Sequence, residues 1–247
     1  MTNKQLLEKL KEDMELRGFS HWTKDSYYRK AKEITEYFGK PMRQVTTKEL
    51  REFLMDYLVK KRGMCEVSAN YYNNVIRFIY DVVLDYPINK RQLPMYKRKR
   101  RLPKILSDEE LNVFFDACEN YMYKTIFMMI YGSGLRISEA TNIRIEDIDS
   151  KNMRIFVRDG KGNKERYTML SKQSLEMLRI YWSKYRQNKR RGRIFLSESG
   201  AAITVGVIRE HFRRYRKKAK LSEKVTMHTL RHCYATNLIE NGATLIQ

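Results

Sequence analysis

The stretch Gly132-Ser133-Gly134-Leu135-Arg136-Ile137-Ser138-Glu139 decides how this sequence is interpreted. It follows the apolar run 126–131, so a buried helix is expected to stop at the two glycines, which allow a tight turn in the left-handed region. Arg136 then opens a new helix, and Glu139, one turn on, is predicted to hold its guanidinium close to the core. The outward face of that guanidinium would suit a phosphate, which its planar donors fit bidentately. Taken alone, an arginine at the start of a helix is more often at the surface or in a salt bridge than in a catalytic site.

A second stretch, residues 227–236 with the sequence MHTLRHCYAT, adds two polar groups on one helix face. His228 and Arg231 are three residues apart, whereas Leu230, Tyr234 and Leu238 recur at the spacing of a buried stripe. Two groups that can grip an anion therefore share a face. An isolated His-x-x-Arg is more often a histidine with its hydrogen bonds made inside the protein beside a solvent-facing arginine than an anion-binding pair.

Composition limits the classes of partner. The 247 residues include 50 Lys and Arg against 29 Asp and Glu, a formal charge of +21, and 42% are hydrophobic. The length allows one large or two modest domains, and the charge predicts a polyanion, first nucleic acid and second an acidic membrane surface. No apolar run approaches the roughly twenty residues of a bilayer span, and the polar start is no signal peptide, so we expect a cytoplasmic protein without a membrane partner. The scattered cysteines lack the spacing of zinc ligands or of a disulfide framework, and we predict reduced core thiols at Cys65, Cys118 and Cys233.

The N-terminal part, residues 1–95, is predicted to be a small domain of four helices. Apolar stripes at helical spacing end near Gly18 and Gly39, a third helix begins at the capping box Thr46-x-x-Glu49, and a fourth begins near Ser68. The face opposite the fourth stripe carries side chains suited to phosphates and base edges, namely Asn70, Asn73, Asn74 and Arg77. Simple solvation of that face is an equally good interpretation.

Residues 96–104 are predicted to be an exposed basic connector. Six of the eight residues from 97 to 104 are basic and cannot pack in a core, and they include Lys97, Arg98, Lys99, Arg100 and Arg101. An inert linker and a localisation signal are alternatives. The position between two domains favours a strap across DNA, in which each neutralised phosphate would steepen the salt dependence of binding.

Residues 105–247 are predicted to form a second domain, helical with a small β-hairpin. A capping box at Ser107 and Glu110 opens a helix, and the hydrophobic helix through Ile130 follows. Residues 153–157 and 166–170 are expected to be two strands around a glycine-containing loop at 159–164. Further helices are expected from residue 171, from 207 to 220 and from 228 to 242.

With that loop included, the sequence resembles the tyrosine recombinases, the phage integrase family. The loop, Gly160-Lys161-Gly162-Asn163-Lys164-Glu165-Arg166, resembles their lysine-bearing β-hairpin, and the order Arg, Lys, His-x-x-Arg is specific. The resemblance implies a mainly α fold with an N-terminal four-helix, SAM-like core-binding domain and a C-terminal catalytic domain. It also implies breakage and rejoining of duplex DNA through a 3′-phosphotyrosine, without metal, ATP or another cofactor.

The resemblance assigns a role to each catalytic candidate. Arg136 and Arg231 would stabilise negative charge on the non-bridging oxygens of the scissile phosphate. Lys161 would protonate the departing 5′ oxygen, with Lys164 as the competitor. His228 would bind the same phosphate or accept the proton of the nucleophile. Glu139 and His232 would support this site, and for His232 a purely structural role is an equal alternative.

Two other kinds of enzyme fit the sequence less well. A metal-dependent integrase needs converging carboxylates, and the only notable acidic cluster, residues 146–149, suits a connection between helix and strand better. Nucleotide hydrolysis is rejected because the loop lacks the Gly-x-x-x-x-Gly-Lys-Ser/Thr pattern.

The sequence departs from the family pattern at its end. Family members carry the nucleophilic tyrosine on a later helix, but sixteen residues follow Arg231 and the only tyrosine among them is Tyr234. It occupies a position where the family usually has phenylalanine, so we expect it to be a packing residue and the nucleophile to be missing. Two hypotheses follow: most of a site-specific recombinase, or a truncated module that occupies recombination sites without cleavage. Intact members act as tetramers on DNA, whereas this chain is expected to be a monomer.

Overall fold

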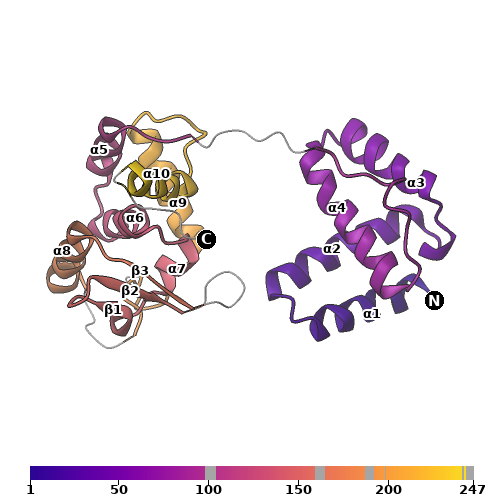
Figure 1. Ribbon diagram of the computed structural model, residues 1–247, viewed down its shortest axis with the longest axis horizontal. Coiled ribbons are helices and arrows are strands. Elements are labelled where there is room, and N and C mark those ends of the chain that lie inside the picture. The colour runs from indigo at the N-terminus through magenta and orange to yellow at the C-terminus, as the bar shows by residue number, and fades with distance from the viewer. Residues whose placement is uncertain (98–103, 159–164, 187–191, 198, 241, 243–247) are drawn as a thin grey trace. The chain divides into compact units, whose positions relative to one another are not determined.

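The computed structural model describes residues 1–97, 104–158, 165–186, 192–197, 199–240 and 242. The chain divides into two compact units, Met1–Arg100 and Arg101–Gln247, called here the N-terminal unit and the C-terminal unit (Figure 1). Most of the predicted basic connector lies outside the described residues. Among the residues that are described, no helix combines the length and the apolar character needed to cross a membrane.

The N-terminal unit consists of the four predicted helices. α1 spans Asn3–Leu16 and α2 spans His21–Phe38, followed by a short 3-10 turn, η1, at Met42–Gln44. α3 (Thr47–Glu52) continues as a π-helix, η2 (Phe53–Lys61). α4 (Glu66–Phe78) continues in the same way as η3 (Ile79–Val83). α1 packs against α2 and η3, and α4 packs against α2 and η2.

The ends of these helices follow from local sequence. Thr46 caps α3: its backbone N–H donates to Glu49 Oε2 at 2.8 Å while its hydroxyl accepts from the Glu49 backbone N–H at 3.3 Å, so the predicted capping box is confirmed. α2 ends at Gly39, which has a left-handed φ of 60°. The predicted stripes face inward, with Leu10, Ile34 and Val75 fully buried.

The C-terminal unit is built around α6 (Tyr121–Ser133). This helix packs against α8 (Lys172–Ile180), α10 (Met227–Glu240) and the short helix α7 (Ile137–Asn142). Its residues 125–130 are all buried, as the apolar run predicts. Two further helices pack on each other, α5 (Asp108–Ala117) and α9 (Val205–Lys218), and α8 continues as the π-helix η5 (Tyr181–Tyr185).

A three-stranded antiparallel sheet completes this unit, in the order β1-β2-β3. β2 (Arg154–Val157) and β3 (Arg166–Met169) are the predicted hairpin, with Val157 opposite Arg166 and Ile155 opposite Thr168. β1 (Ile148–Asp149) was not predicted and follows the 3-10 turn η4 (Ile145–Asp147). The mainly α fold with a small sheet is therefore confirmed.

The cysteines follow the prediction only in part. Cys118 and Cys233 are buried free thiols, and burial raises the pKa of Cys118 to about 12. Cys65 is exposed, so its assignment to the core is wrong. It precedes α4, in a connection between helices where no apolar stripe continues.

Candidate functional site

Arg136 stands where α6 ends and α7 begins. α6 stops at Gly134, whose φ of 60° is left-handed, and Arg136 is the residue that caps α7. Glu139 accepts two hydrogen bonds from Arg136, one from its backbone N–H to Oε2 at 2.7 Å and one from Nη1 to Oε1 at 2.7 Å. The predicted pairing of Arg136 with Glu139 is thus present, and it fixes the guanidinium beside the turn.

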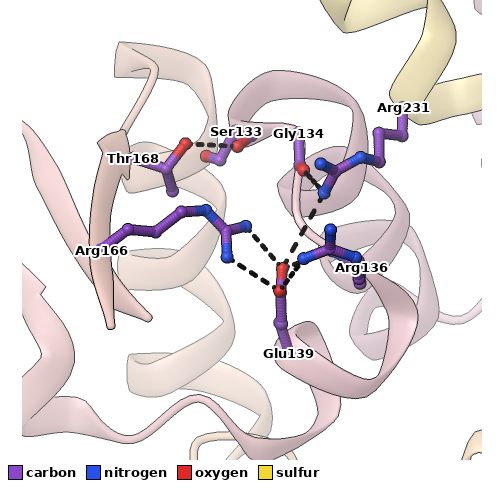
Figure 2. Close-up of polar contacts among 7 residues, drawn as sticks. All are labelled: Ser133, Gly134, Arg136, Glu139, Arg166, Thr168 and Arg231. Atoms are coloured by element: carbon purple, nitrogen blue, oxygen red, sulfur yellow. Dashed lines mark hydrogen bonds and ion pairs between the residues drawn. The ribbon is translucent and has the colours of Figure 1, made fainter. Parts of the chain in front are cut away.

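Arg166, at the start of β3, binds the same carboxylate (Figure 2). Its Nη1 donates to Glu139 Oε1 at 2.9 Å and its Nη2 to Oε2 at 2.8 Å, which is a bidentate pair. The sequence motifs assigned no role to Arg166. Alternate residues of a strand share a face, so the predicted strand places Arg166 on the same face as Thr168, but it does not reveal what that face contacts. Thr168 Oγ1 in turn donates to the Ser133 carbonyl at 2.7 Å, so both residues point toward the end of α6.

Arg231 reaches the cluster from α10, which packs directly on α6. Its Nη1 donates to the carbonyl oxygen of Gly134 and lies 3.9 Å from Glu139 Oε2. Arg136 and Arg231, 95 positions apart in the printed sequence, therefore lie beside the same carboxylate, which Arg166 approaches from the other side in Figure 2. This is the convergence that the two sequence motifs predicted for the arginines.

The cluster holds more positive than negative charge. The Glu139 side chain is 3% exposed, while those of Arg136, Arg166 and Arg231 are each 33% exposed. Burial would raise the pKa of Glu139, but hydrogen bonds from Arg166 and Arg136 outweigh it and lower the pKa to about 2. Burial, together with the neighbouring Arg136, lowers the pKa of Arg231. Three guanidiniums against one carboxylate leave two net positive charges, so the site favours an anion.

Tyr234 packs against the turn, as predicted. A Cβ added to Gly134 would lie 2.4 Å from Cδ1 of the Tyr234 ring, so the ring occupies the space that a larger residue at 134 would need. The tyrosine is half-buried and follows Arg231 on α10. Close packing of the ring explains why the turn needs glycine at this position.

The two histidines of the motif lie on α10, and both are exposed. His228 is in the first turn, three residues before Arg231, and its side chain makes no polar contact in the described part of the chain. The same holds for His232. Lys161 and Lys164, the two lysine candidates, lie outside the described residues, so their predicted roles stay predictions.

The polar face of α4 differs from the predicted DNA-facing surface. Asn73 is 2% exposed, and its Nδ2 donates to the carbonyls of Leu93 at 3.4 Å and Pro94 at 3.2 Å. Arg77 donates from Nη2 to the Leu93 carbonyl at 2.6 Å and from Nε to Asn73 Oδ1 at 3.2 Å. The expectation that Asn73 is exposed is therefore wrong: the backbone of residues 93–94 has no helix or strand partner, and these side chains supply its donors.

The other predicted DNA-binding residues differ in whether their side chains are exposed. Asn70 is also occupied, because it exchanges two hydrogen bonds with the backbone of Tyr96 at 2.9 and 2.8 Å. Asn74 and Lys97 are exposed and remain candidates. The four other connector candidates, Arg98, Lys99, Arg100 and Arg101, lie outside the described residues.

The acidic segment 146–149 serves the fold. Asp147 is buried and accepts from Arg158 Nε at 2.6 Å and from the Arg144 backbone N–H at 2.9 Å. Asp149 accepts from Arg154 Nε at 2.8 Å. These bonds hold the connection between η4 and the sheet, in agreement with the structural interpretation of this cluster.

In this helical unit, two arginines that are remote in sequence meet at a shielded carboxylate beside a small hairpin. This is the arrangement that the sequence resemblance implies for a catalytic domain. The phage integrase family model matches residues 104–247, and the model of the phage integrase N-terminal SAM-like domain matches residues 6–90. The chain belongs to the phage integrase family, the tyrosine recombinases.

Curated relatives and solved structures agree with this assignment. The Sinorhizobium fredii protein y4qK, described as an integrase/recombinase, is 33% identical over 240 residues, which cover 96% of this chain and 77% of the relative. The tyrosine recombinase XerA of Pyrococcus horikoshii is 29% identical, covering 99% and 83%. The lambda integrase (residues 75–356) bound to DNA shares the fold with a TM-score of 0.77 and 19% identity, covering 98% of this chain and 88% of that one.

Proposed function

We propose that this protein is a site-specific DNA recombinase that binds duplex DNA and breaks and rejoins it through a 3′-phosphotyrosine, without metal or ATP. The observation that carries the proposal is the pair Arg136 and Arg231, which both lie beside Glu139 and remain 33% exposed. In the described part of the chain, Arg136 hydrogen-bonds with its side chain only through Nη1, to Glu139. Its remaining donors are free for a phosphate.

The pair suits the chemistry of a phosphodiester under attack. Negative charge grows on the non-bridging oxygens as the attacking oxygen approaches, and fixed guanidiniums stabilise that charge without reorganising. Family resemblance supplies the other roles: Lys161 as the acid for the 5′ oxygen, and His228 as a phosphate ligand or a base for the nucleophile. The position of His228 on the helix of Arg231 is compatible with this role.

Charge supports duplex DNA as the partner. The chain carries a formal +21, and α9 alone presents the exposed basic residues Arg209, Arg213, Arg214, Lys217 and Lys218. Phosphate neutralisation by such side chains gives affinity that falls steeply with salt. Structurally similar chains include the XerH recombinase bound to its difH substrate, with a TM-score of 0.71, 23% identity and coverage of 93% of this chain and 71% of that chain.

A second candidate function is occupation of recombination sites without cleavage. It is favoured by the packing of Tyr234. This tyrosine follows Arg231 by three residues, but its half-buried ring lies against Gly134. On this hypothesis the arginine pair grips a phosphate that no side chain of residues 1–247 attacks.

One experiment separates the two functions. The 247-residue chain is incubated with duplexes selected from a random-sequence pool and then nicked next to the selected site, so that a cleaved strand cannot be resealed. A covalent protein–DNA adduct supports the recombinase, and a gel shift without adduct supports site occupation. Failure to select any duplex sequence would refute both.

The arginine pair is tested in the same assay with hydrogen peroxide as an external attacking oxygen, so that cleavage does not depend on which tyrosine attacks. Removing one charge-stabilising donor typically costs about 10²–10³-fold in rate. We expect this loss for Arg136→Ala and Arg231→Ala, with binding largely retained. Arg154→Ala, an exposed arginine of β2, is the matched control. Cleavage by the first two variants at the unsubstituted rate would contradict the proposal.

A further inference from the structure

Four hydrogen bonds fill the acceptor positions of Glu139. A carboxylate has two oxygens with about four lone-pair sites. Arg136 supplies two donors and Arg166 the other two, one from each residue to Oε1 and one from each to Oε2. Arg231 is left at 3.9 Å from Oε2, beyond a hydrogen bond, and donates instead to the carbonyl of Gly134. It is the remaining arginine of the cluster drawn in Figure 2.

From this arrangement we propose that Arg166 is a positioning residue, which keeps Arg231 available for the phosphate by occupying the Glu139 oxygens that Arg231 would otherwise bind. The proposal rests on the proposed function of the arginine pair. A carboxylate that is 3% exposed cannot leave lone pairs unfilled without a large cost, so it takes the nearest donor. With Arg166 removed, that donor is Arg231, and its guanidinium turns inward.

Arg166 also links the sheet to this function. It starts β3, and two residues later Thr168 bonds the Ser133 carbonyl at the end of α6. The strand is therefore tied at two points to the turn that carries Arg136.

Lysine cannot replace Arg166 fully. The guanidinium fits both carboxylate oxygens at once with parallel N–H groups, whereas an ammonium is a point charge on a flexible stem. Arg166→Lys keeps the charge but leaves an oxygen of Glu139 less well filled. Arg166→Gln removes the charge as well. We therefore expect Arg166→Gln to disturb the position of Arg231 more than Arg166→Lys does.

The test compares Arg166→Gln and Arg166→Lys with Arg154→Gln, which removes an exposed arginine of the same hairpin that binds Asp149. Three quantities are measured: the peroxide-dependent cleavage rate, the dissociation constant for the selected duplex, and the NMR signal of the Arg231 Nε–H group in the chain without DNA. A misplaced catalytic group typically costs about 10²-fold in rate. We expect about 10- to 100-fold slower cleavage for Arg166→Gln, an intermediate loss for lysine, duplex binding within about threefold, and a shifted Arg231 signal.

A double variant separates positioning from simple stability. If Arg166 acts only by filling Glu139, then in a Glu139→Gln background, where the carboxylate no longer attracts Arg231, Arg166→Gln should slow cleavage by less than about threefold more. Additive losses would overturn the proposal. So would an unshifted Arg231 signal with cleavage at the normal rate, or equal losses of binding and cleavage, which would make Arg166 a DNA contact.

The two proposals fail separately. An unsubstituted chain that binds and cleaves no duplex refutes the proposed function, while the Arg231 signal still shows whether Arg166 controls the guanidinium. If Arg166→Gln shows no cooperative thermal unfolding, Arg166→Lys carries the comparison.

Discussion

Glu139→Gln gives the sharpest test of the electrostatic argument. A pKa of about 2 in the folded chain, against 4.5 for an unperturbed glutamate, corresponds to about 3 kcal/mol of stability. Because the folded pKa is the lower one, this contribution is complete above about pH 4.5 and is lost as the pH falls toward 2. The amide keeps the size of the side chain but has no charge to oppose three guanidiniums. We expect the variant to be less stable by about 3 kcal/mol at pH 7, with the difference from the unsubstituted chain vanishing toward pH 2.

Urea unfolding followed by fluorescence measures this difference. The two tryptophans lie in different units, so a Trp22→Phe background leaves Trp182 to report the C-terminal unit alone; Trp22 is 81% exposed, and its loss should cost little. Glu146→Gln is the matched control, because Glu146 is exposed and its contact with Arg144 spans 3.7 Å. It should cost less than about 1 kcal/mol. Equal unfolding free energies for Glu139→Gln and the control at pH 7, or a difference that persists unchanged at pH 3, would show that the Glu139 carboxylate does not supply this stability.

Three further substitutions test the fold, each by urea unfolding of the unit concerned. Gly134→Ala should cost about 2–3 kcal/mol, because φ is 60° and the new Cβ would meet the Tyr234 ring at 2.4 Å; a neutral result would mean that the ring does not pack there. Asn73→Ala should cost about 1–3 kcal/mol, since two backbone carbonyls lose a donor, whereas exposed Asn74→Ala should stay within about 0.5 kcal/mol; equal losses would contradict the assignment. Ser107→Ala should cost about 1 kcal/mol through the α5 cap, and an unchanged stability would count against that capping box.

Sequence predicted the features whose causes are local. The capping boxes at Thr46 and Ser107 depend on residues three positions apart, and both form. The run through Ile130 is buried on all sides, and the strand predicted at residues 153–157 forms as β2, Arg154–Val157. The pairing of Arg136 with Glu139 is likewise a contact within one helical turn.

Features that depend on distant partners were missed. Arg166 lies 27 positions from Glu139, and only the hairpin register and its packing on α6 bring them together. Asn73 was assigned to a polar surface because residues 93–94 show no periodic pattern that would reveal them as its partners. Amide and guanidinium groups suit phosphates and backbone carbonyls alike, so residue type could not separate the two roles.

The central helix α6 has a consequence for engineering. It is simultaneously the interior of the C-terminal unit and the support of the turn that aims Arg136, since it packs on α7, α8, α10 and β3. Close-packed interiors transmit strain over several residues. Substitutions intended to raise stability are therefore better placed on exposed surfaces, for example those of α5 or α8, than among the buried side chains around Phe127. Around Phe127, even a stabilising substitution that adds or removes one methyl group would shift the turn and so change the direction of the Arg136 side chain.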